Sequence, residues 1–187
     1  MAHFGASVEY ALHCLLWLVE PPEASPSSRD LAEFQGAPVP YMAKIFPKLE
    51  KAGIVTAAEG IKGGYRLAKP ANRITVLEVA DAVEGEKPLF DCQEIRGRCA
   101  LFDGTPPRWA VSGVCEIHAV MLRAERLMRE ELSKTTLASL ADGVAQKAPV
   151  RFGGTVHEWF DERTATRSRV HTVALQNRRT KSDAEPK

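Results

Sequence analysis

The sequence lacks an apolar run long enough to cross a membrane. Its best stretch, Ala11 to Val19, falls short of the roughly 18 residues that a spanning helix needs and contains His13. The first eight residues lack the basic region of a secretory signal, and no small-residue cleavage pattern follows them. We therefore expect a protein of the cytoplasm without a membrane partner.

An excess of charge of one sign is also missing, because 25 lysines and arginines accompany 24 aspartates and glutamates in 187 residues. Near neutrality removes any argument for nucleic-acid binding from composition alone, so that such an argument has to come from local geometry. Hydrophobic residues make up 44% of the chain, which is typical of a globular protein and excludes collagen-like, fibrous and strongly disordered classes. The length suggests one domain with an additional element.

Enzyme motifs are absent as well. The sequence contains no phosphate-binding glycine loop, no dinucleotide-binding glycine pattern and no nucleophile elbow. A thiol enzyme could be built on Cys115 and His118, but their spacing of three residues on a helix fits ligation of one centre at least as well. We therefore predict that the protein is not an enzyme.

Helical periodicity and turn signals predict a winged helix-turn-helix domain over residues 1–86. Apolar spacing predicts three helices, β-branched and aromatic residues predict two strands around a glycine-rich turn, and Thr75 is expected to cap a fourth helix that ends at Gly85. The three helices and the two strands are expected at residues 8–19, 29–34, 42–49, 54–56 and 65–68. The predicted fold is mainly α with a small β-hairpin.

The remainder of the chain divides into three predicted parts. Residues 87–116 lose periodicity and gather Cys, Gly and Pro, and a long loop of this kind usually has a function such as binding a ligand. Residues 117–145 carry a broad apolar stripe that predicts a long helix and a short following helix. Residues 146–187 are polar and basic, so we expect a largely disordered extension in which only 156–160 docks as a short amphipathic piece.

Three of the four cysteines lie in this loop together with a histidine. In a reducing compartment thiols are more often metal-binding, redox-active or buried than paired in disulfides. Soft thiolates favour iron-sulfur clusters, zinc or copper(I), and the spacing matches neither a zinc ribbon nor a bacterial ferredoxin. Inert cysteines are the alternative. The candidate ligands are Cys92, Cys99, Cys115 and His118.

The first predicted helix contributes two further candidates. Glu9 and His13 are four residues apart and share one face, so they could complete a metal site or form an ordinary exposed pair. Cys14 points elsewhere on this helix, and we expect it in the core.

Donors for phosphate groups are expected on the third helix and the wing, because these elements present side chains to duplex DNA in winged domains. The alternative is a winged module that binds protein and leaves its lysines solvated. The candidate DNA-binding residues are Ser28, Tyr41, Lys44, Lys48, Lys62 and Arg66.

Four runs of the sequence resemble the Rrf2 family of bacterial transcription regulators. They are Tyr41 to Ile45, Leu49 to Val55, the wing run Gly60 to Ala68 and the run Ile74 to Val79, and the resemblance extends over about residues 5–142. It implies a homodimer that places a winged helix-turn-helix on promoter DNA and dimerises through a long helix.

The resemblance also implies a cofactor, since sensing members of the family bind a [2Fe-2S] or [4Fe-4S] cluster through three cysteines before the long helix. Cys92, Cys99 and Cys115 stand at the matching positions, and His118 matches the fourth ligand of some members. Glu9 and His13 match residues that other members recruit from the first helix of the partner subunit. The gap between Cys99 and Cys115 is longer than in the usual sensors, so a cluster held by two cysteines with Glu9, His13 or His118 stays an alternative.

We therefore predict a dimeric DNA-binding repressor that senses redox state, nitric oxide or iron through an iron-sulfur cluster. A zinc-binding or metal-free thiol regulator on the same fold is the first alternative. A winged module that binds no DNA is the second.

Overall fold

The structure is a computed structural model that describes residues 3–23, 25–58 and 63–182, with the backbone alone at 168 and 170–182. The α-helices are α1 (Ala6–Leu16), α2 (Ser28–Gln35), α3 (Val39–Lys51), α4 (Val76–Glu84), α5 (Arg108–Val111), α6 (Glu116–Lys134), α7 (Leu137–Ala145) and α8 (Phe152–Ser182). The strands are β1 (Val55–Ala57) and β2 (Tyr65–Leu67), and the short 3-10 helices are η1 (Ala71–Arg73), η2 (Ile95–Arg98) and η3 (Ala100–Phe102). The predicted class, mainly α with one β-hairpin, is confirmed.

Local capping signals fix the ends of the short helices. The Ser27 hydroxyl accepts a hydrogen bond from the Asp30 amide, and the Asp30 carboxylate accepts one from the Ser27 amide at 2.8 Å. Gly36 ends α2 in the left-handed conformation, with φ of +72°. Thr75 and Glu78 form the same reciprocal cap at the start of α4. These caps satisfy backbone amides that the helix itself leaves without partners.

The core of the winged domain lies where α1 to α4 meet. Apolar side chains at helical spacing on each helix point into it, and removing them from water is the main source of its stability. Its fully buried members include Ala11, Leu15, Leu31, Met42, Phe46, Leu49, Val79 and Val83.

The wing is an antiparallel hairpin in which Val55 lies opposite Leu67. Its base approaches the segment before α2 closely, because a Cβ atom added at Gly64 would lie 2.2 to 2.5 Å from backbone atoms of Ser25 and Pro26. Only glycine therefore fits at this position, which holds the wing beside the helix-turn-helix.

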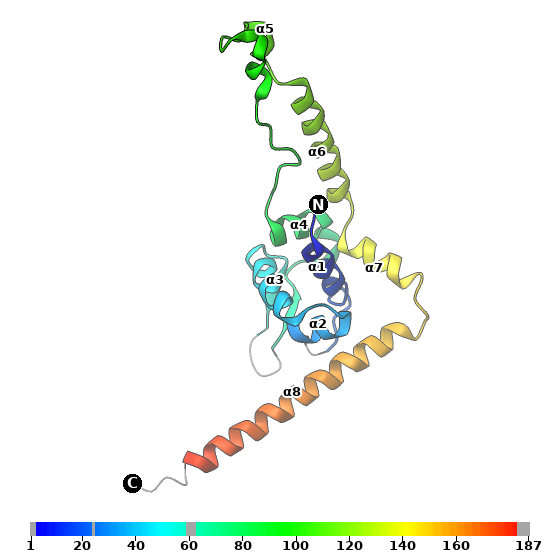
Figure 1. Ribbon diagram of the computed structural model, residues 1–187. Coiled ribbons are helices and arrows are strands. Elements are labelled where there is room, and N and C mark those ends of the chain that lie inside the picture. Colours follow the sequence, from blue (N-terminus) through cyan, green and yellow to red (C-terminus); the bar gives the residue numbers. More distant parts are fainter. Residues whose placement is uncertain (1–2, 24, 59–62, 183–187) are drawn as a thin grey trace.

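The long helix α6 projects away from the winged domain and carries the loop from 88 to 115 at its far end (Figure 1). Arg129 joins α6 to α4 through an ion pair with Asp81 at 2.9 Å. The Leu89 amide donates to a Glu125 carboxylate oxygen at 2.9 Å, so the start of the loop runs back along α6.

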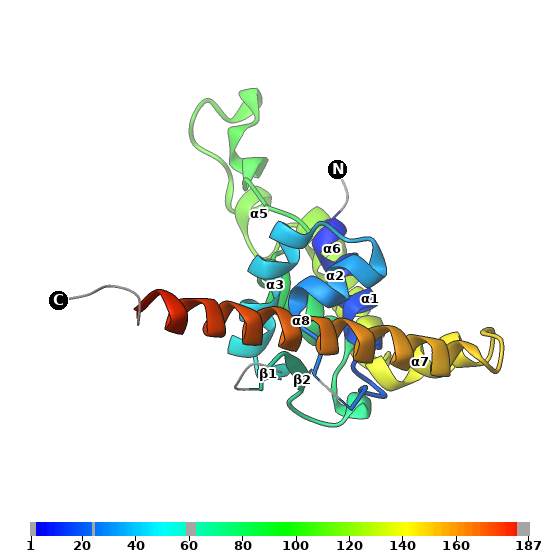
Figure 2. The same ribbon diagram turned by 90° about the horizontal axis from the view of Figure 1, so that it is seen from below.

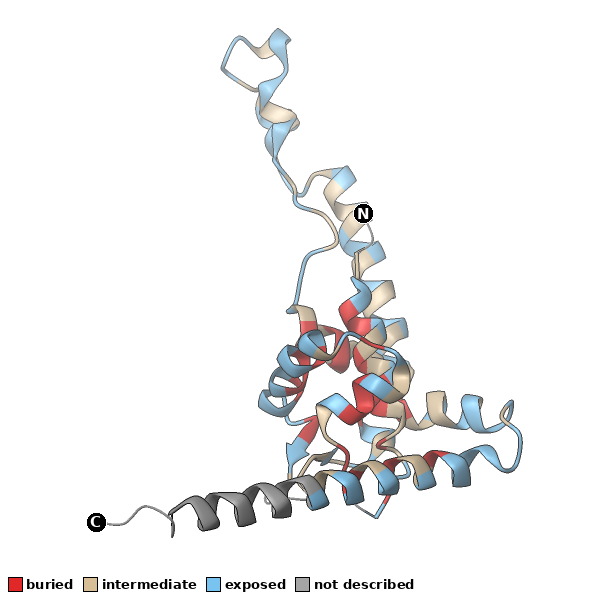
Figure 3. Ribbon diagram, turned by 60° about the horizontal axis from the view of Figure 1, so that its bottom comes forward, coloured by how far each residue is buried: buried red, intermediate tan, exposed pale blue. Residues whose placement is uncertain are grey.

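The C-terminal extension differs from the prediction of a largely disordered segment. Helix α8 begins at Phe152 and crosses beneath the winged domain (Figure 2). Its first half is docked, because Val156, Phe160 and Thr164 are buried against the domain (Figure 3). The low average hydrophobicity of the extension favoured disorder, but a few apolar side chains spaced four apart are enough to anchor one helix.

Within the described parts of the chain, no helix is both long and apolar enough to cross a membrane.

Candidate DNA-binding face and cysteine loop

Helix α3 divides cleanly into a buried and an exposed face. Met42, Ile45, Phe46 and Leu49 are buried in the core, so the opposite face meets solvent. Two predicted DNA-binding residues, Tyr41 and Lys44, lie on this exposed face. The Tyr41 ring is 41% exposed and contacts the Tyr10 ring edge-on, with a centroid distance of 6.0 Å. Tyr41 therefore packs against α1 on one side and stays partly open to solvent.

Lys48 has a different environment from Lys44. Its ammonium nitrogen donates a hydrogen bond to the Val83 carbonyl at 2.6 Å, at the C-terminal end of α4. A cation is favourable there because the last carbonyls of a helix carry partial negative charge. In this arrangement Lys48 holds α3 against α4, whereas the Lys44 ammonium has no hydrogen bond or ion pair with any residue that the structure describes.

The wing contributes Arg66, which lies on β2 and is exposed. Its Nε donates to the Ser25 hydroxyl at 2.6 Å, and its Nη2 donates to the Glu23 carbonyl at 3.1 Å. Lys62 lies outside the described residues. Ser28 is the first residue of α2, and Ser27, not Ser28, provides the cap of that helix.

The base of the wing also receives a residue that the sequence analysis did not identify. Arg167 of α8 donates to the Gly63 carbonyl at 3.4 Å and to the Ser25 carbonyl at 3.3 Å. Its guanidinium also pairs with the buried Asp30 carboxylate at 3.1 Å. One arginine thus joins the extension to the wing and to α2.

A signal for this contact was present in the sequence. Trp159, Arg163 and Arg167 follow one another at intervals of four, beside the buried Val156 and Phe160. In the structure Arg163 pairs with Glu33 and lies over the Trp159 ring, 5.3 Å from its centroid. Intervals of four place side chains on one helix face, so this stripe could have been recognised as a docking surface.

The loop cysteines differ in exposure. Cys92 and Cys115 are half-buried, whereas Cys99 is exposed. Cys115 directly precedes the first residue of α6, and His118 lies in the first turn of that helix. Cys99 lies between the short helices η2 and η3.

Arg96 and Glu94 form the electrostatic centre of the loop. The hydrogen bond to Glu94 is the main cause that raises the pKa of Arg96, and the charges of Cys115 and Cys92 raise it further. The pKa of Glu94 is lowered, chiefly by its hydrogen bond with Arg96 and to a lesser extent by His118. Both thiols and the imidazole therefore lie within electrostatic range of this ion pair.

Arg96 also joins the two arms of the loop. Its guanidinium donates to the backbone carbonyls of Ser112 at 3.3 Å and Gly113 at 3.1 Å. This bridge brings the arm that contains Cys92 toward the arm that leads to Cys115.

In the part of the chain that the structure describes, no three Cys, His, Asp or Glu side chains come close enough to form a metal site. Glu9 and His13 are both exposed on α1, and they are not brought to the loop within one chain. The donor types around Arg96, two thiols and an imidazole, suit an iron-sulfur cluster or zinc, and the cation would balance thiolate charge. In the described conformation the loop therefore has side chains of the right type to bind a cluster or zinc, but they do not lie close enough together to share one.

Cys14 is a core residue, as predicted. It is fully buried, and its thiol donates a hydrogen bond to the Leu31 carbonyl at 3.7 Å. Burial raises its pKa to about 12, because desolvation disfavours the thiolate.

Helix α6 has an apolar stripe that the chain itself does not cover. No residue of this 19-residue helix is buried. Ile117, Val120 and Leu127 follow one face at helical spacing and are 64%, 50% and 58% exposed. An uncovered stripe of this length is typical of a helix that packs against another protein surface.

Comparison with known proteins identifies relatives of this architecture. A model of the Rrf2 family, described as iron-dependent transcriptional regulator, matches residues 4–143. The protein rrf2 of Nitratidesulfovibrio vulgaris is 35% identical over 114 residues, which cover 61% of this chain and 69% of that protein.

Solved structures with a similar fold include two named regulators. CymR of B. subtilis, titled the global cysteine regulator, gives a TM-score of 0.59 at 21% identity and covers 76% of this chain and 98% of its own. IscR of T. potens gives a TM-score of 0.59 at 22% identity, over 80% of this chain and 93% of that one. At these identities the likeness shows the winged-helix fold alone.

Proposed function

Since the chain belongs to the Rrf2 family of transcriptional regulators, we propose that it binds promoter DNA as a homodimer and that an iron-sulfur cluster in its cysteine loop controls this binding. The family consists of regulators rather than enzymes, and its members bind DNA and typically dimerise. A regulator that acts on promoters works in the cytoplasm, where we place this protein.

The observation that carries the DNA-binding proposal is the open face of α3 beside the wing. Tyr41 and Lys44 supply a hydroxyl and a cation on this face, and Arg66 supplies a guanidinium on the wing. Donors in this arrangement suit phosphate groups on both sides of a major groove that receives the helix. Two other candidates have positional roles in this proposal. Lys48 holds α3 against α4 through its hydrogen bond to Val83, and Ser28 begins α2.

The uncovered stripe of α6 supports the homodimer. Two copies of Ile117, Val120 and Leu127 would cover one another if the helices packed together. Dimerisation also sets the separation of the two α3 helices, which have to lie about one DNA turn, roughly 34 Å, apart to read two half-sites.

For the cluster, the chain offers Cys92, Cys115 and His118 around Arg96, with Cys99 as a third thiol in the same loop. Glu9 and His13 of a partner subunit are the other candidates that the family resemblance gives. When bound, an iron-sulfur cluster responds to oxidation, nitric oxide or loss of iron by changing or losing its bonds to protein.

The chain's own residues connect this loop to the winged domain. The loop leaves α4 and returns at Cys115 to start α6, and Arg129 clamps α6 to α4 through Asp81. To bind one cluster, the arm that contains Cys92 and the arm that leads to Cys115 have to move closer together. Closure would shift the start of α6 relative to α4 and thereby change how the two winged domains of a dimer are placed. We propose that the protein represses transcription when the two winged domains are placed so that both fit the operator.

The DNA-binding proposal is tested by measuring affinity at several salt concentrations for duplexes selected from a random-sequence pool. Lys44→Ala and Arg66→Ala should weaken binding and each reduce the slope of log affinity against log salt by about one. Lys134→Ala is the control, because this lysine pairs with Glu130 at the end of α6. Equal slopes for Lys44→Ala and Lys134→Ala would contradict the assignment of α3.

The cluster proposal is tested by anaerobic purification with analysis of iron and acid-labile sulfide. We expect both, with visible absorption that Cys92→Ala and Cys115→Ala remove and Cys14→Ala retains. Zinc without sulfide would favour a zinc-binding regulator on the same fold.

A metal-free thiol regulator is the second candidate, and one observation favours it. Cys99 is exposed in the described conformation, so oxidants and other thiols can reach it. If the purified protein contains no metal and its DNA affinity still changes on oxidation, the thiols themselves are the sensor.

A further inference from the structure

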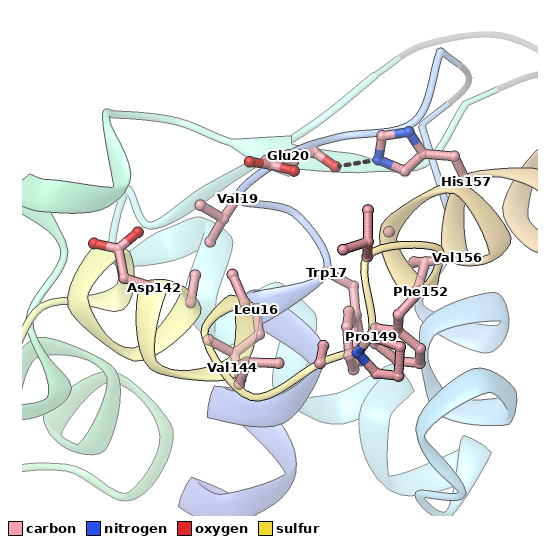
Figure 4. A pocket seen from close by; sticks show the side chains of 15 residues that line it. Leu16, Trp17, Val19, Glu20, Asp142, Val144, Pro149, Phe152, Val156 and His157 are labelled. Atoms are coloured by element: carbon pink, nitrogen blue, oxygen red, sulfur yellow. Dashed lines mark hydrogen bonds between the residues drawn. The ribbon is translucent and has the colours of Figure 1, made fainter.

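A cavity of about 330 Å³ lies between the end of α1, helix α7 and the start of α8 (Figure 4). Its size lies at the lower end of the range for small-molecule sites in proteins. The cavity is remote from the cysteine loop, which lies at the far end of α6 (Figure 1).

The extension makes one wall of this cavity. Pro149, Phe152, Val156 and His157 line it and lie beyond residue 143, where the match to the family ends. The opposite wall belongs to the winged domain, which contributes Leu16 at the end of α1 and Trp17, Val19 and Glu20 in the segment after it. The cavity therefore depends on the docking of α8, so it is a feature of this chain rather than of the family segment.

The chemistry of the lining is uneven. The inner walls are apolar and aromatic, whereas the exposed residues Glu20 and Asp142 bring two carboxylates to the rim of the cavity. Among the described residues that line the cavity there is no lysine or arginine. The ring Nε2 of His157 is engaged with the Glu20 carbonyl at 3.1 Å. An apolar chamber with acidic groups complements a molecule that has a compact apolar body and one positive charge.

We propose that this cavity binds a small amine with an aromatic or compact apolar body. The apolar part lies among Leu16, Trp17, Phe152 and Val156, and the ammonium group faces Glu20 and Asp142. Burial of the apolar part supplies most of the affinity, and the carboxylates distinguish amines from anions of the same shape.

The cavity is connected to the helix-turn-helix through Trp17. The Trp17 indole donates to the Gln35 side chain at 2.8 Å, and its ring contacts Phe34 with a centroid distance of 5.1 Å. Both partners belong to α2, and Trp17 also contacts Phe152 of α8 at 6.0 Å. A ligand that moves Trp17 or Phe152 therefore acts on α2 and on the docking of α8.

We expect the amine to change DNA affinity through these contacts. This second step rests on the proposed function, whereas the binding step does not. The two steps are therefore measured separately.

The binding experiment uses phenethylamine as the probe and 3-phenylpropionate as an anion of similar shape, with calorimetry and ligand-observed NMR on the full chain. We expect the amine to bind at least about tenfold more tightly than the anion, because the two carboxylates attract the ammonium group and repel the anion. Glu20→Gln and Asp142→Asn should each weaken amine binding several-fold. Equal binding of amine and anion would overturn the proposal.

Two adjacent glycines of α8 provide a matched pair of variants. Gly153 lines the cavity and Gly154 does not, and a Cβ atom at either position meets nothing within 4 Å. Gly153→Leu should fill the cavity and abolish amine binding, whereas Gly154→Leu should leave it unchanged. Both replacements favour the helix, so both proteins should fold. Undiminished binding by Gly153→Leu, or loss of the dimer in that variant alone, would overturn the site.

DNA affinity is then measured with and without saturating phenethylamine. A change in wild type that is absent in Gly153→Leu supports the connection through Trp17. Amine binding without any change in DNA affinity would overturn that connection and leave the site standing. Amine binding by a protein that binds no duplex at all would overturn the proposed function alone.

Discussion

The guanidinium of Arg167 in α8 lies 3.1 Å from the carboxylate of Asp30 in α2. Asp30 is 2% exposed and accepts hydrogen bonds from the Ser27 amide and hydroxyl as well. The same arginine donates to backbone carbonyls at the base of the wing. The extension is therefore part of the support of the helix-turn-helix.

Replacing Arg167 should destabilise the protein, because the buried Asp30 carboxylate would lose the nearer of its two cations and keep only Arg163, at 4.0 Å. For Arg167→Ala we expect the free energy of unfolding to fall by about 1 to 3 kcal/mol, less than for a fully buried pair because the arginine side chain is 28% exposed. Urea unfolding followed by circular dichroism measures this. Arg169→Ala is the control, since that residue is exposed. An equal effect of both variants would show that Arg167 contributes no specific support.

Phe160 should be the main apolar anchor of α8. It is fully buried, and its ring centroid lies 4.9 Å from that of Phe34 in α2. We expect Phe160→Ala to lower the free energy of unfolding by about 3 to 5 kcal/mol, through lost burial and the cavity that remains. Glu158→Ala, on the exposed face of α8, should change it by less than about 0.5 kcal/mol. Limited proteolysis should cut the Phe160→Ala extension first, and resistance equal to that of wild type would contradict the anchor.

The winged domain was predictable because its signals are local. Ser27, Gly36 and Thr75 mark helix ends whichever tertiary structure follows: Ser27 caps α2, Gly36 ends it and Thr75 caps α4. Gly63 and Gly64 precede the returning strand of the wing, as the pattern indicated. Such features depend on the backbone conformation of a few neighbouring residues, and the types of those residues indicate that conformation.

The extension and the loop were less predictable because their structure depends on distant partners. The first half of α8 is ordered by Phe34, Asp30 and Ser25, more than 100 positions earlier in the chain. The role of Lys48 as a donor to Val83 likewise depends on how α3 meets α4. The candidate ligands of the loop were predicted by residue type. The sequence does not show how far apart they lie, nor that Arg96 bridges the two arms of the loop. Spacing alone does not determine such long-range geometry.

The thiols should differ in reactivity. Burial raises the pKa of Cys14 to about 12, so its reactive thiolate is scarce at neutral pH. In metal-free native protein we expect three thiols to react with a maleimide reagent and the fourth, Cys14, to react only after unfolding. Mass spectrometry of peptides identifies the labelled sites. Rapid labelling of Cys14 in folded protein would contradict its place in the core.

The apolar stripe of α6 should form the dimer interface. Leu127 is 58% exposed, and a charge there would be buried in the dimer without a partner. We expect Leu127→Glu to shift the protein to monomers in sedimentation experiments while the winged domain stays folded. Leu122→Glu is a control, because Leu122 is exposed but lies off the line of Ile117, Val120 and Leu127. If both variants dissociate the dimer equally, the interface extends beyond the stripe of Ile117, Val120 and Leu127.

The carboxylate of Glu84 in α4 caps the start of α1, where Gly5 has no side chain to do so. It accepts hydrogen bonds from the Gly5 amide at 2.8 Å and from the Ser7 hydroxyl, and it pairs with Lys87 at 2.8 Å. Hydrogen bonds from Lys87, Ser7 and Gly5 lower its pKa from 4.5 to about 2. Each of them favours the charged form, which stabilises the folded state.

Glu84 should therefore make stability depend on pH in the acid range. Its contribution is fully present above the unfolded pKa near 4.5 and is lost as the pH falls toward the folded pKa of about 2. For this side chain, which is 10% exposed, the contribution is about 2 to 3 kcal/mol. Urea unfolding of wild type and Glu84→Gln at several pH values between 2 and 6 measures it. The difference between the two should shrink as the pH falls, whereas Glu158→Gln, an exposed control, should follow wild type throughout. A difference that stays constant with pH would mean that the uncharged side chain caps α1 equally well.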